Sequence, residues 1–419
     1  MDLETSLKKL FSLHNFGIKL GLQNTQAFLD RLGNPQKDLK CIHIAGSNGK
    51  GSTASFIASI LQEFGFKVGL YTSPHFVKFN ERIRINGNQI DDKYISNFIN
   101  EYVDYIDEHQ LTFFEVTTAM AFKYFSEKSP DYCVIETGLG GRLDATNVLD
   151  PLAVVITSIS LEHTNVLGNT IEQIAYEKAE IIKNDSKVFI GLLKDEAEKV
   201  VINKCHKTNS SLNKLKDFLT AENDSIRLKI DDFNLMFEPP LKGIYQKYNS
   251  ALASVVILKT FQLSNKEKYI NGIRNVLSNT GLQGRYEYYH KSPTIIFDSA
   301  HNPEGIESFL NEFEKEYLNY KKRKLLFGVM RDKSIKEMLQ ILSKYFDEIF
   351  LTKINYDRAA DPEEIRQLCN EFNILNKIIT DPELLIENFK SGNKDDCLVV
   401  LGSMYLLGEI KQRILERIS

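Results

Sequence analysis

The chain contains few cysteines, and those it has are scattered. Its 419 residues include five: Cys41, Cys133, Cys205, Cys369 and Cys397. The number is odd and no two of them form a C-x-x-C pair, so the sequence indicates neither a disulfide framework nor a zinc site. Such a pattern is typical of a reducing cytosol, and we expect a cytoplasmic protein.

The chain also lacks a long apolar run and a strong charge of either sign. No stretch approaches the ~20 apolar residues that a membrane span needs, and the amino-terminal stretch MDLETSLKKLFSLHNFG is acidic from its second residue. Lys and Arg total 52 against 56 for Asp and Glu, a formal net charge of -4. This balance gives no general attraction to nucleic acid or to an anionic membrane. We therefore expect a soluble, unexported protein with small-molecule partners, whose anionic ligands are held by local charge.

Strand-like and helical patterns alternate along the chain, which predicts parallel sheets with flanking helices. The tract 191–232 is more polar and is expected to interrupt the alternation, and 225–238 predicts a hairpin of two short strands. We interpret this hairpin as a small β appendage. The apolar runs that predict strands are 41–45, 67–72, 132–136, 153–159, 294–298, 324–329, 348–352 and 397–402.

Turn residues cluster in SNTGLQG, at 278–284, between the two series of strands. The fold class expected is therefore α/β with two domains. Residues 1–282 would form a mostly parallel sheet of the P-loop type with flanking helices and the β appendage. Residues 283–419 would form a smaller Rossmann-like α/β domain.

The stretch HIAGSNGKGST resembles a nucleotide phosphate loop with one difference. The usual pattern G-x-x-x-x-G-K-[ST] places a hydroxyl directly after the lysine to hold Mg²⁺, whereas here Gly51 follows Lys50. An apolar strand pattern precedes the loop and a helical pattern follows it. A helix amino terminus in this context offers N–H groups and a positive dipole end to a phosphate. The sequence predicts a phosphate loop whose metal ligands come from elsewhere in the chain.

Polar residues follow the neighbouring strand patterns, where an open parallel sheet binds its ligands. Ser73 follows the second pattern, Glu136 ends the third, and His163 follows the fourth. Taken singly, the serine could form a turn, the glutamate could cap a helix, and the histidine could be structural. Together, a hydroxyl, a carboxylate and an imidazole could supply the Mg²⁺ ligands that Gly51 cannot.

Seven motifs occur in order along the chain: AGSNGKGST, YTSPHFVKFNERIRINGNQI, VIETGLGGRLDATNV, EHTNVLGNTIEQIAYEKA, GRYE, DSAHNPEG and LGSMYLLGE. Together they resemble the folylpolyglutamate synthase and dihydrofolate synthase family of the Mur ligase superfamily, from about residue 16 onward. The resemblance implies an ATP-dependent amide ligase. It would join L-glutamate to dihydropteroate, to reduced folates, or to both through an acyl phosphate, and we favour a bifunctional enzyme. The alternatives are a monofunctional folylpolyglutamate synthase and a non-catalytic, nucleotide-dependent binding protein.

The same resemblance implies roles for individual residues. Ser73 and Glu136 would hold one Mg²⁺, and His163 with Glu136 a second, while K⁺ is a further candidate cofactor. Lys50, Lys178 and His301 are the catalytic candidates, with Lys178 carbamylated and His301 the base for the incoming amine. The residues that would bind ATP are Gly46, Asn48, Gly49, Lys50, Gly51, Ser52, Asn249, Arg285, Asp298, His301 and Asn302.

Several of the candidate residues leave structural alternatives open. Phe113 and Phe114 would stack on the folate, although aromatic residues at helical spacing are usually core. Asp298 could instead cap the helix that follows it. Lys178 could be an ordinary solvated lysine, and Lys333 in VMRDKS is better explained as a surface charge.

The chain departs from the family pattern at three positions. Tyr245 stands where the family often has His, Glu162 where Asp is usual, and Glu180 where Gly is usual. Only 45 residues precede Gly46, which we expect to leave no room for the UDP-binding domain of a cell-wall peptide ligase. The family's commonest state implies a monomer.

Overall fold

The computed structural model describes residues 1–17, 21–221 and 225–418. The chain forms two compact units, each of the α/β class, as expected. The first unit comprises Met1–Pro74, Asn80–Pro239 and Lys247–Leu282. The second comprises His75–Phe79, Pro240–Gln246 and Gln283–Ser419. Two short segments that precede residue 282 thus belong to the second unit.

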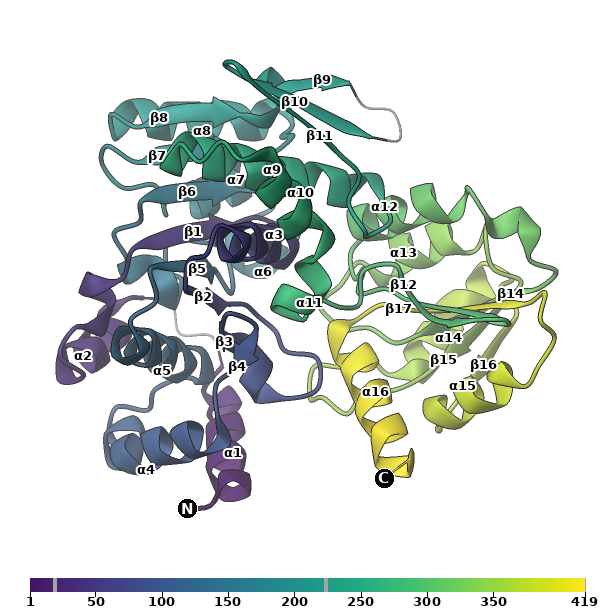
Figure 1. Ribbon diagram of the computed structural model, residues 1–419. Coiled ribbons are helices and arrows are strands. Elements are labelled where there is room, and N and C mark those ends of the chain that lie inside the picture. The colour runs from purple at the N-terminus through teal and green to yellow at the C-terminus, as the bar shows by residue number, and fades with distance from the viewer. Residues whose placement is uncertain (18–20, 222–224, 419) are drawn as a thin grey trace. The chain divides into compact units, whose positions relative to one another are not determined.

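An eight-stranded sheet forms the centre of the first unit, in the order β4-β3-β2-β5-β1-β6-β7-β8 (Figure 1). The strands from β2 to β8 in this order run parallel, and β3 and β4 form an antiparallel edge. Because parallel strands end at the same edge of a sheet, the loops after β5, β1 and β6 emerge side by side. The bounds are β1 (Cys41–Ala45), β2 (Val68–Tyr71), β3 (Ile83–Ile85), β4 (Asn88–Gln89), β5 (Tyr132–Glu136), β6 (Ala153–Ile156), β7 (Lys187–Ile190) and β8 (Ser211–Lys214).

The helices of the first unit cover both faces of this sheet, which explains why β1 is buried along its whole length. Helix α3 packs against α10 and α11, and α7 packs against α8. Local signals fix the starts of several helices: Thr112 and Glu115 form a capping box on α5, and Thr170 and Gln173 form one on α7. The bounds are α1 (Leu3–Ser12), α2 (Gln23–Arg31), α3 (Lys50–Glu63), α4 (Asp92–Glu108), α5 (Phe113–Lys128), α6 (Thr164–Leu167), α7 (Ile171–Ala179), α8 (Asp195–Lys207), α9 (Ile244–Phe261), α10 (Lys266–Arg274) and α11 (Val276–Thr280).

The tract 191–232 differs from its prediction. Helix α8 and strand β8 continue the alternation, so the expected interruption is wrong up to residue 214. Strand β8 has a polar sequence because it lies at the edge of the sheet, where fewer side chains are buried. The expected appendage is present as β10 (Ile226–Ile230) and β11 (Phe233–Phe237), and β9 (Leu219–Ala221) adds a third antiparallel strand.

A six-stranded sheet forms the second unit, in the order β12-β13-β17-β14-β15-β16, with β12 antiparallel and the other strands parallel. Buried apolar clusters lie on both of its faces. The strands are β12 (Glu287–Lys291), β13 (Thr294–Phe297), β14 (Arg323–Phe327), β15 (Glu348–Leu351), β16 (Asn376–Ile378) and β17 (Cys397–Leu401). The helices are α12 (Pro303–Phe313), α13 (Ile335–Leu342), α14 (Pro362–Glu371), α15 (Pro382–Lys390) and α16 (Met404–Ile418).

The segment His75–Phe79 packs in the second unit against two glycines, which leave space for Phe76. An added Cβ at Gly408 would lie 1.8 Å from the backbone oxygen of Phe76, and one at Gly284 would lie 2.3 Å from its ring. The Lys411 ammonium stands 5.5 Å from the centre of the same ring. Phe76 thus occupies a site that larger residues at 284 and 408 would fill.

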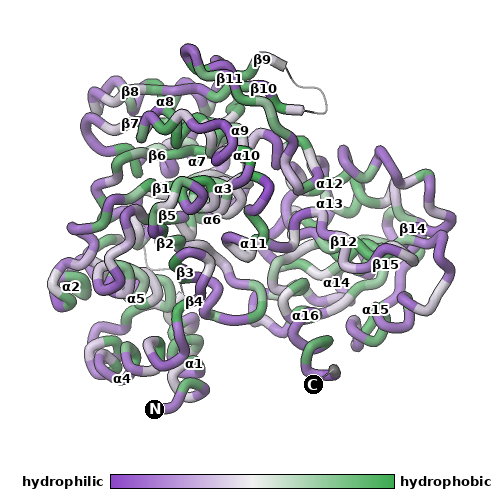
Figure 2. Tube along the Cα trace, in the orientation of Figure 1, coloured by the Kyte–Doolittle hydropathy of each residue, from purple (hydrophilic) through white to green (hydrophobic). Residues whose placement is uncertain are grey.

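The distribution of hydrophobic residues agrees with the two-sheet architecture. Hydrophobic residues concentrate along the strands of both sheets, while hydrophilic residues gather in loops and on outer helix faces (Figure 2). Within the described part of the chain, no helix has the length and apolar character needed to cross a membrane.

The five cysteines all lie inside the fold, with free thiols. Cys41 on β1 pairs in register with Cys133 on β5. Burial raises the pKa of Cys205 and of Cys369 to about 11. At neutral pH these thiols are therefore protonated and poorly nucleophilic.

Candidate active site

The predicted phosphate loop connects β1 to α3 and rests on the end of β6. Ser47 N donates to Ser158 O at 2.8 Å, and Asn48 N donates to Ser158 Oγ at 2.9 Å. Thr157 Oγ1 donates to Asn48 O at 2.7 Å. A Cβ at Gly46 would lie 1.9 Å from Thr157 Oγ1, so only glycine allows this close approach. The segment after β6 therefore fixes the shape of the loop, a role that the sequence analysis did not assign to it.

Gly49 and Asn249 meet where α3 begins. Gly49 has a positive φ of 84° and precedes the first helical residue, Lys50. A Cβ at Gly49 would stand 2.5 Å from Asn249 Oδ1, and Thr53 Oγ1 donates to the same oxygen at 3.4 Å. The structure thus brings Asn249, distant in sequence, to the phosphate loop. Gly49 carries no side chain to cap the helix, so the first N–H groups of α3 can face a phosphate.

Two lysines converge on one carbonyl of this loop. Lys50 Nζ donates to Gly46 O at 2.8 Å and to Ser47 O at 3.2 Å. Lys178 Nζ, from α7, donates to Gly46 O at 2.9 Å. Both side-chain amino groups therefore lie at the predicted phosphate loop.

Lys178 is buried and paired with Glu162. Its Nζ lies 2.8 Å from Glu162 Oε1, and the two side chains are 1% and 5% exposed. Burial lowers the pKa of Lys178, and Lys50 adds to this shift while Glu162 opposes it. Burial alone would raise the pKa of Glu162, but Lys178, Lys50 and His163 outweigh it and hold that pKa well below its usual range. The alternative of a solvated lysine at 178 is thereby wrong.

Glu136 lies between the start of α3 and the loop that follows β2. Ser73 N donates to Glu136 Oε2 at 3.0 Å, and a Cβ at Gly51 would stand 3.4 Å from the same oxygen. The carboxylate is 3% exposed. Two of the three predicted metal ligands, Ser73 and Glu136, are therefore adjacent, directly beside the glycine that replaces the usual hydroxyl.

These residues fit a Mg²⁺ site completed by a nucleotide. In the described ranges, no group of three His, Cys, Asp or Glu side chains could hold a metal by itself. Mg²⁺ in phosphate-transferring sites is commonly bound through one or two carboxylates, with water and substrate phosphates completing its shell. The Glu136 carboxylate beside the phosphate loop matches that donor set. The third predicted ligand, His163, is the residue before α6 and has a positive φ of 46°.

The turn after Glu136 is organised by Asp144, which the sequence analysis missed. Gly138 N and Leu139 N both donate to Asp144 Oδ2 at 2.8 Å. Thr146 N donates to Asp144 Oδ1 at 3.0 Å, and Thr146 Oγ1 lies 2.8 Å from Nε2 of the buried His43. The acidic residue in GLGGRLDATN was the signal for this network, but only the fold reveals its partners.

The two phenylalanines of the predicted folate side have different surroundings. Phe113 is buried, with the His14 ring stacked on it at 4.1 Å between centroids and the Arg82 guanidinium 5.0 Å from its centre. Phe114 is half-buried beside Gly138, where an added Cβ would lie 2.4 Å from its ring. Phe113 therefore packs against its own chain, and Phe114 lies beside the turn that follows Glu136.

In the second unit, Asp298 follows β13 and accepts several hydrogen bonds. Tyr286 N donates to it at 2.7 Å, Ala300 N at 2.8 Å, and the hydroxyl of Tyr245 at 3.4 Å. Burial raises the pKa of Asp298, although Arg285 opposes the shift. Tyr245, which replaces the histidine usual in the family, thus contacts a predicted ATP-binding residue.

The other ATP-binding candidates of the second unit, Arg285, His301 and Asn302, lie around the loop that follows β13. Arg285 donates from its guanidinium to Gly284 O at 3.0 Å and to Ser299 Oγ. His301 Nδ1 lies 2.9 Å from Ser299 O, a contact that places the ring proton on Nδ1. Asn302 Oδ1 accepts from Gly305 N at 2.8 Å and caps α12. The helix cap is therefore Asn302, not Asp298.

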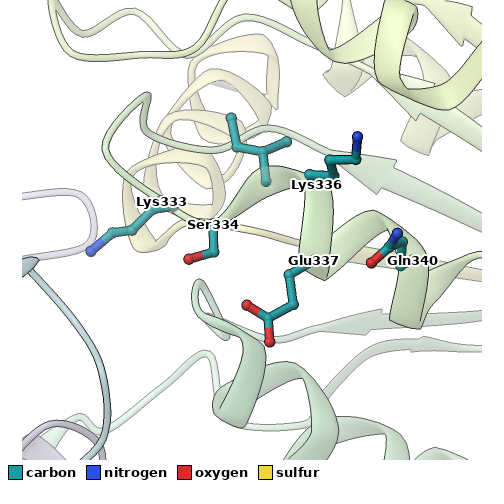
Figure 3. A pocket seen from close by; sticks show the side chains of 6 residues that line it. Lys333, Ser334, Lys336, Glu337 and Gln340 are labelled. Atoms are coloured by element: carbon teal, nitrogen blue, oxygen red, sulfur yellow. The ribbon is translucent and has the colours of Figure 1, made fainter. Parts of the chain in front are cut away.

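A hollow of about 720 Å³ lies elsewhere in the second unit, at the start of α13 (Figure 3). Lys333, the weaker candidate of the sequence analysis, lines it. Figure 3 shows Lys333 and Lys336 extending away from each other, so their charges do not converge on one point. The residues of the predicted site lie outside its lining, which consists of Lys333, Ser334, Ile335, Lys336, Glu337 and Gln340.

Comparison with known proteins places this geometry in a family. Residues 44–257 match the model of the Mur ligase middle domain, and residues 284–404 match that of the Mur ligase glutamate ligase domain. The dihydrofolate synthase/folylpolyglutamate synthase of Bacillus subtilis is 34% identical over 420 residues, which cover 95% of this chain and 96% of that protein. The chain belongs to the dihydrofolate synthase/folylpolyglutamate synthase family of Mur ligases. The family resemblance found in the sequence is thus confirmed.

Solved structures of this family agree with the fold. The Escherichia coli FolC protein, in complex with DHPP and ADP, has a TM-score of 0.86 and 27% identity, over 100% of this chain and 99% of that one. The Mycobacterium tuberculosis folylpolyglutamate synthase, complexed with ADP and AMPPCP, has the same TM-score and identity over 99% of both chains. Members of the family thus bind adenine nucleotides on this fold.

Proposed function

We propose that this chain is a bifunctional dihydrofolate synthase/folylpolyglutamate synthase, an ATP-dependent ligase that joins L-glutamate to dihydropteroate and to reduced folates. Family membership over nearly the whole chain carries the assignment. The observation on this chain that supports it best is the convergence of Lys50 and Lys178 on Gly46 O, beside the Glu136 carboxylate.

The proposed reaction begins with an anion approaching a polyanion. The folate or pteroate carboxylate attacks the γ-phosphorus of ATP, the bond from that phosphorus to the ADP oxygen breaks, and an acyl phosphate forms. The α-amino group of glutamate then attacks the acyl carbon and phosphate leaves, while the amine loses a proton. Coulomb repulsion opposes the first step, and positive charge in a site shielded from water lowers its barrier. Lys50, the N–H groups that begin α3 and a bound Mg²⁺ would provide that charge.

Glu136 and Ser73 would hold one Mg²⁺, and His163 would contribute with Glu136 to a second. Bound there, Mg²⁺ would neutralise charge on the β- and γ-phosphates. The surroundings of Glu136 support this role, because its buried carboxylate lies beside the phosphate loop, and Mg²⁺ in phosphate sites is commonly bound through one or two carboxylates. K⁺ remains a further candidate cofactor.

Lys178 is proposed as a carbamylated residue, the modification that the family resemblance implies. Carbamylation requires the neutral amine to attack CO₂, forming an N–C bond and releasing a proton. Burial supports the proposal because it lowers the pKa of Lys178 and so favours the neutral amine. Glu162 opposes it by stabilising the ammonium form.

Arg285, Asp298 and Asn302 are proposed to contact the nucleotide, and His301 is proposed as the base. The Nδ1 contact of His301 with Ser299 O supports the last role. It leaves Nε2 as the nitrogen that carries the lone pair of a neutral ring. Phe114, beside the turn after Glu136, is the better placed of the two aromatic candidates for the folate.

The test is a mass-spectrometric product assay with ATP, Mg²⁺, L-glutamate and either dihydropteroate or tetrahydrofolate, run beside Lys50→Ala. We expect both substrates to gain one glutamate residue with the wild type and neither to gain it with the variant. Addition to tetrahydrofolate alone would indicate the monofunctional folylpolyglutamate synthase. Addition to neither, with ATP still bound, would overturn the ligase assignment.

A further inference from the structure

The turn that follows Glu136 lies directly on helix α7. A Cβ added at Gly141 would stand 2.7 Å from Glu177 O and 2.9 Å from Lys178 O. Real Cβ atoms do not approach backbone so closely. The N–H of Arg142 donates to Glu177 O at 2.8 Å. The turn and the helix therefore touch through their backbones at Lys178 and at the residue before it.

A two-point ion pair joins the same two elements. Arg142 Nε lies 3.1 and 3.2 Å from the two carboxylate oxygens of Glu177, and its terminal nitrogen donates to Oε1 at 3.0 Å. The two side chains are 40% and 17% exposed. Ion pairs this accessible contribute little to stability. A planar guanidinium bound at two points, however, fixes the orientation of its partner.

Each side of this contact carries a residue of the proposed site. Glu136 ends β5 immediately before the turn, and Lys178 follows Glu177 on α7 and reaches Gly46 O. We infer that Gly141, Arg142 and Glu177 form a clamp that sets the position of Lys178 relative to Glu136. Arg142 and Glu177 are positioning residues in this clamp.

Helix α7 is short, and its side-chain cap lies at the end away from Lys178. It has nine residues, and its capping box, formed by Thr170 and Gln173, fixes only its first turn. Lys178 lies at the other end, one residue before the helix terminates at Ala179. A displacement of about 1 Å between reacting groups can cost ~100-fold in rate. The clamp holds the end of the helix that carries Lys178.

The inference rests on the proposed function, and its test separates the two. We would purify the wild type, Arg142→Ala, Arg142→Lys and the charge exchange Arg142→Glu with Glu177→Arg. Lys216→Ala is the matched control, because Lys216 also pairs with a carboxylate, Glu198, at 2.8 Å and is 50% exposed. For each protein we would measure kcat, KM for ATP and amide hydrogen exchange across α7.

We expect Arg142→Ala to lower kcat about tenfold while KM for ATP changes less than about twofold, with faster hydrogen exchange in the last turn of α7. Arg142→Lys retains the charge without the two-point geometry, so it should resemble Arg142→Ala. The charge exchange should recover most of the loss, and Lys216→Ala should match the wild type.

Unchanged kcat and unchanged exchange in α7 for Arg142→Ala would overturn the clamp, as would a loss that Lys216→Ala shares. If the wild type itself forms no product, the proposed function fails. Hydrogen exchange in α7 then still decides whether the clamp exists.

Discussion

Lys178 Nζ lies 2.8 Å from Glu162 Oε1, and the Coulomb attraction between them acts where water is almost absent. The pair sits against Gly46, the first glycine of the phosphate loop. An aspartate is usual in the family at position 162. The glutamate of this chain is longer by one methylene, so the ion pair with Lys178 is formed by a longer side chain here.

Removing Glu162 should therefore destabilise the protein. With Lys178 unmodified, we expect Glu162→Gln to lower the free energy of unfolding by about 3 kcal/mol, because it leaves the Lys178 ammonium buried without its counterion. Urea unfolding at neutral pH measures the change. Glu387→Gln is the control, because Glu387 and its partner Lys390 are 40% and 26% exposed, and accessible pairs contribute less than about 1 kcal/mol. Equal losses in both variants would contradict this account.

The same pair should control carbamylation of Lys178. We expect a carbamate carbon signal in ¹³C NMR of the protein equilibrated with ¹³C-labelled bicarbonate, and its absence in Lys178→Arg. Glu162→Gln should reach the same occupancy at a lower bicarbonate concentration, because the ammonium form loses its stabilising partner. A signal that persists in Lys178→Arg would place the modification elsewhere.

Glu136 should govern the response to Mg²⁺. Chelation with EDTA should abolish phosphate release from ATP, and added Mg²⁺ should restore it. In Glu136→Gln, which keeps the shape but removes the charge, we expect the Mg²⁺ concentration for half activation to rise at least about tenfold. A normal Mg²⁺ titration in this variant would exclude Glu136 as a ligand.

Gly49 offers a test of the contact with Asn249. Gly49→Ala combines a left-handed backbone with a Cβ 2.5 Å from Asn249 Oδ1, whereas Gly65, with a φ of 94°, has nothing within 4 Å of its added Cβ. Both alanine variants should lose about 1 kcal/mol of stability from the backbone. Only Gly49→Ala should also raise KM for ATP, by about tenfold, because the loop must shift. Steady-state kinetics of the two variants decides the point.

His43 should make the first unit sensitive to acid. Burial, with a smaller contribution from Lys183, lowers the pKa of its imidazole from 6.5 to about 3. The neutral ring is the folded form, so its stabilising contribution is present above pH 6.5 and is lost as the pH falls towards 3. The loss is on the order of 5 kcal/mol. In His43→Asn, the free energy of unfolding should fall less steeply between pH 6.5 and 4 than in the wild type.

The strands that the sequence predicts best are those with both faces buried. The boundaries of β1 and β5 coincide with their apolar runs, since a continuous apolar segment has few other places to fold. Strands β8, β12 and β16 escaped prediction because their sequences SLNK, EYYHK and NKI are polar. Those strands lie at or next to a sheet edge, where only pairing with a neighbour defines a strand.

The contacts of the candidate site also include some that the sequence predicts and some that it does not. The approach of Ser73 to Glu136 was predictable, because strand order and the rule on carboxyl ends bring such residues together. The pairing of Lys178 with Glu162 and the hydrogen bonds of Asp144 were not, because they depend on side-chain reach between separate loops. The capping role of Asn302 required the exact start of α12, and helix boundaries are among the least certain features of a sequence.

The burial of all five thiols makes the chain suited to site-specific labelling. A cysteine introduced on an exposed helix would be the most accessible thiol in the protein, so a maleimide dye should react there first without removal of the native residues. Two such positions, one in each unit, would give a fluorescence ruler for distance changes during turnover.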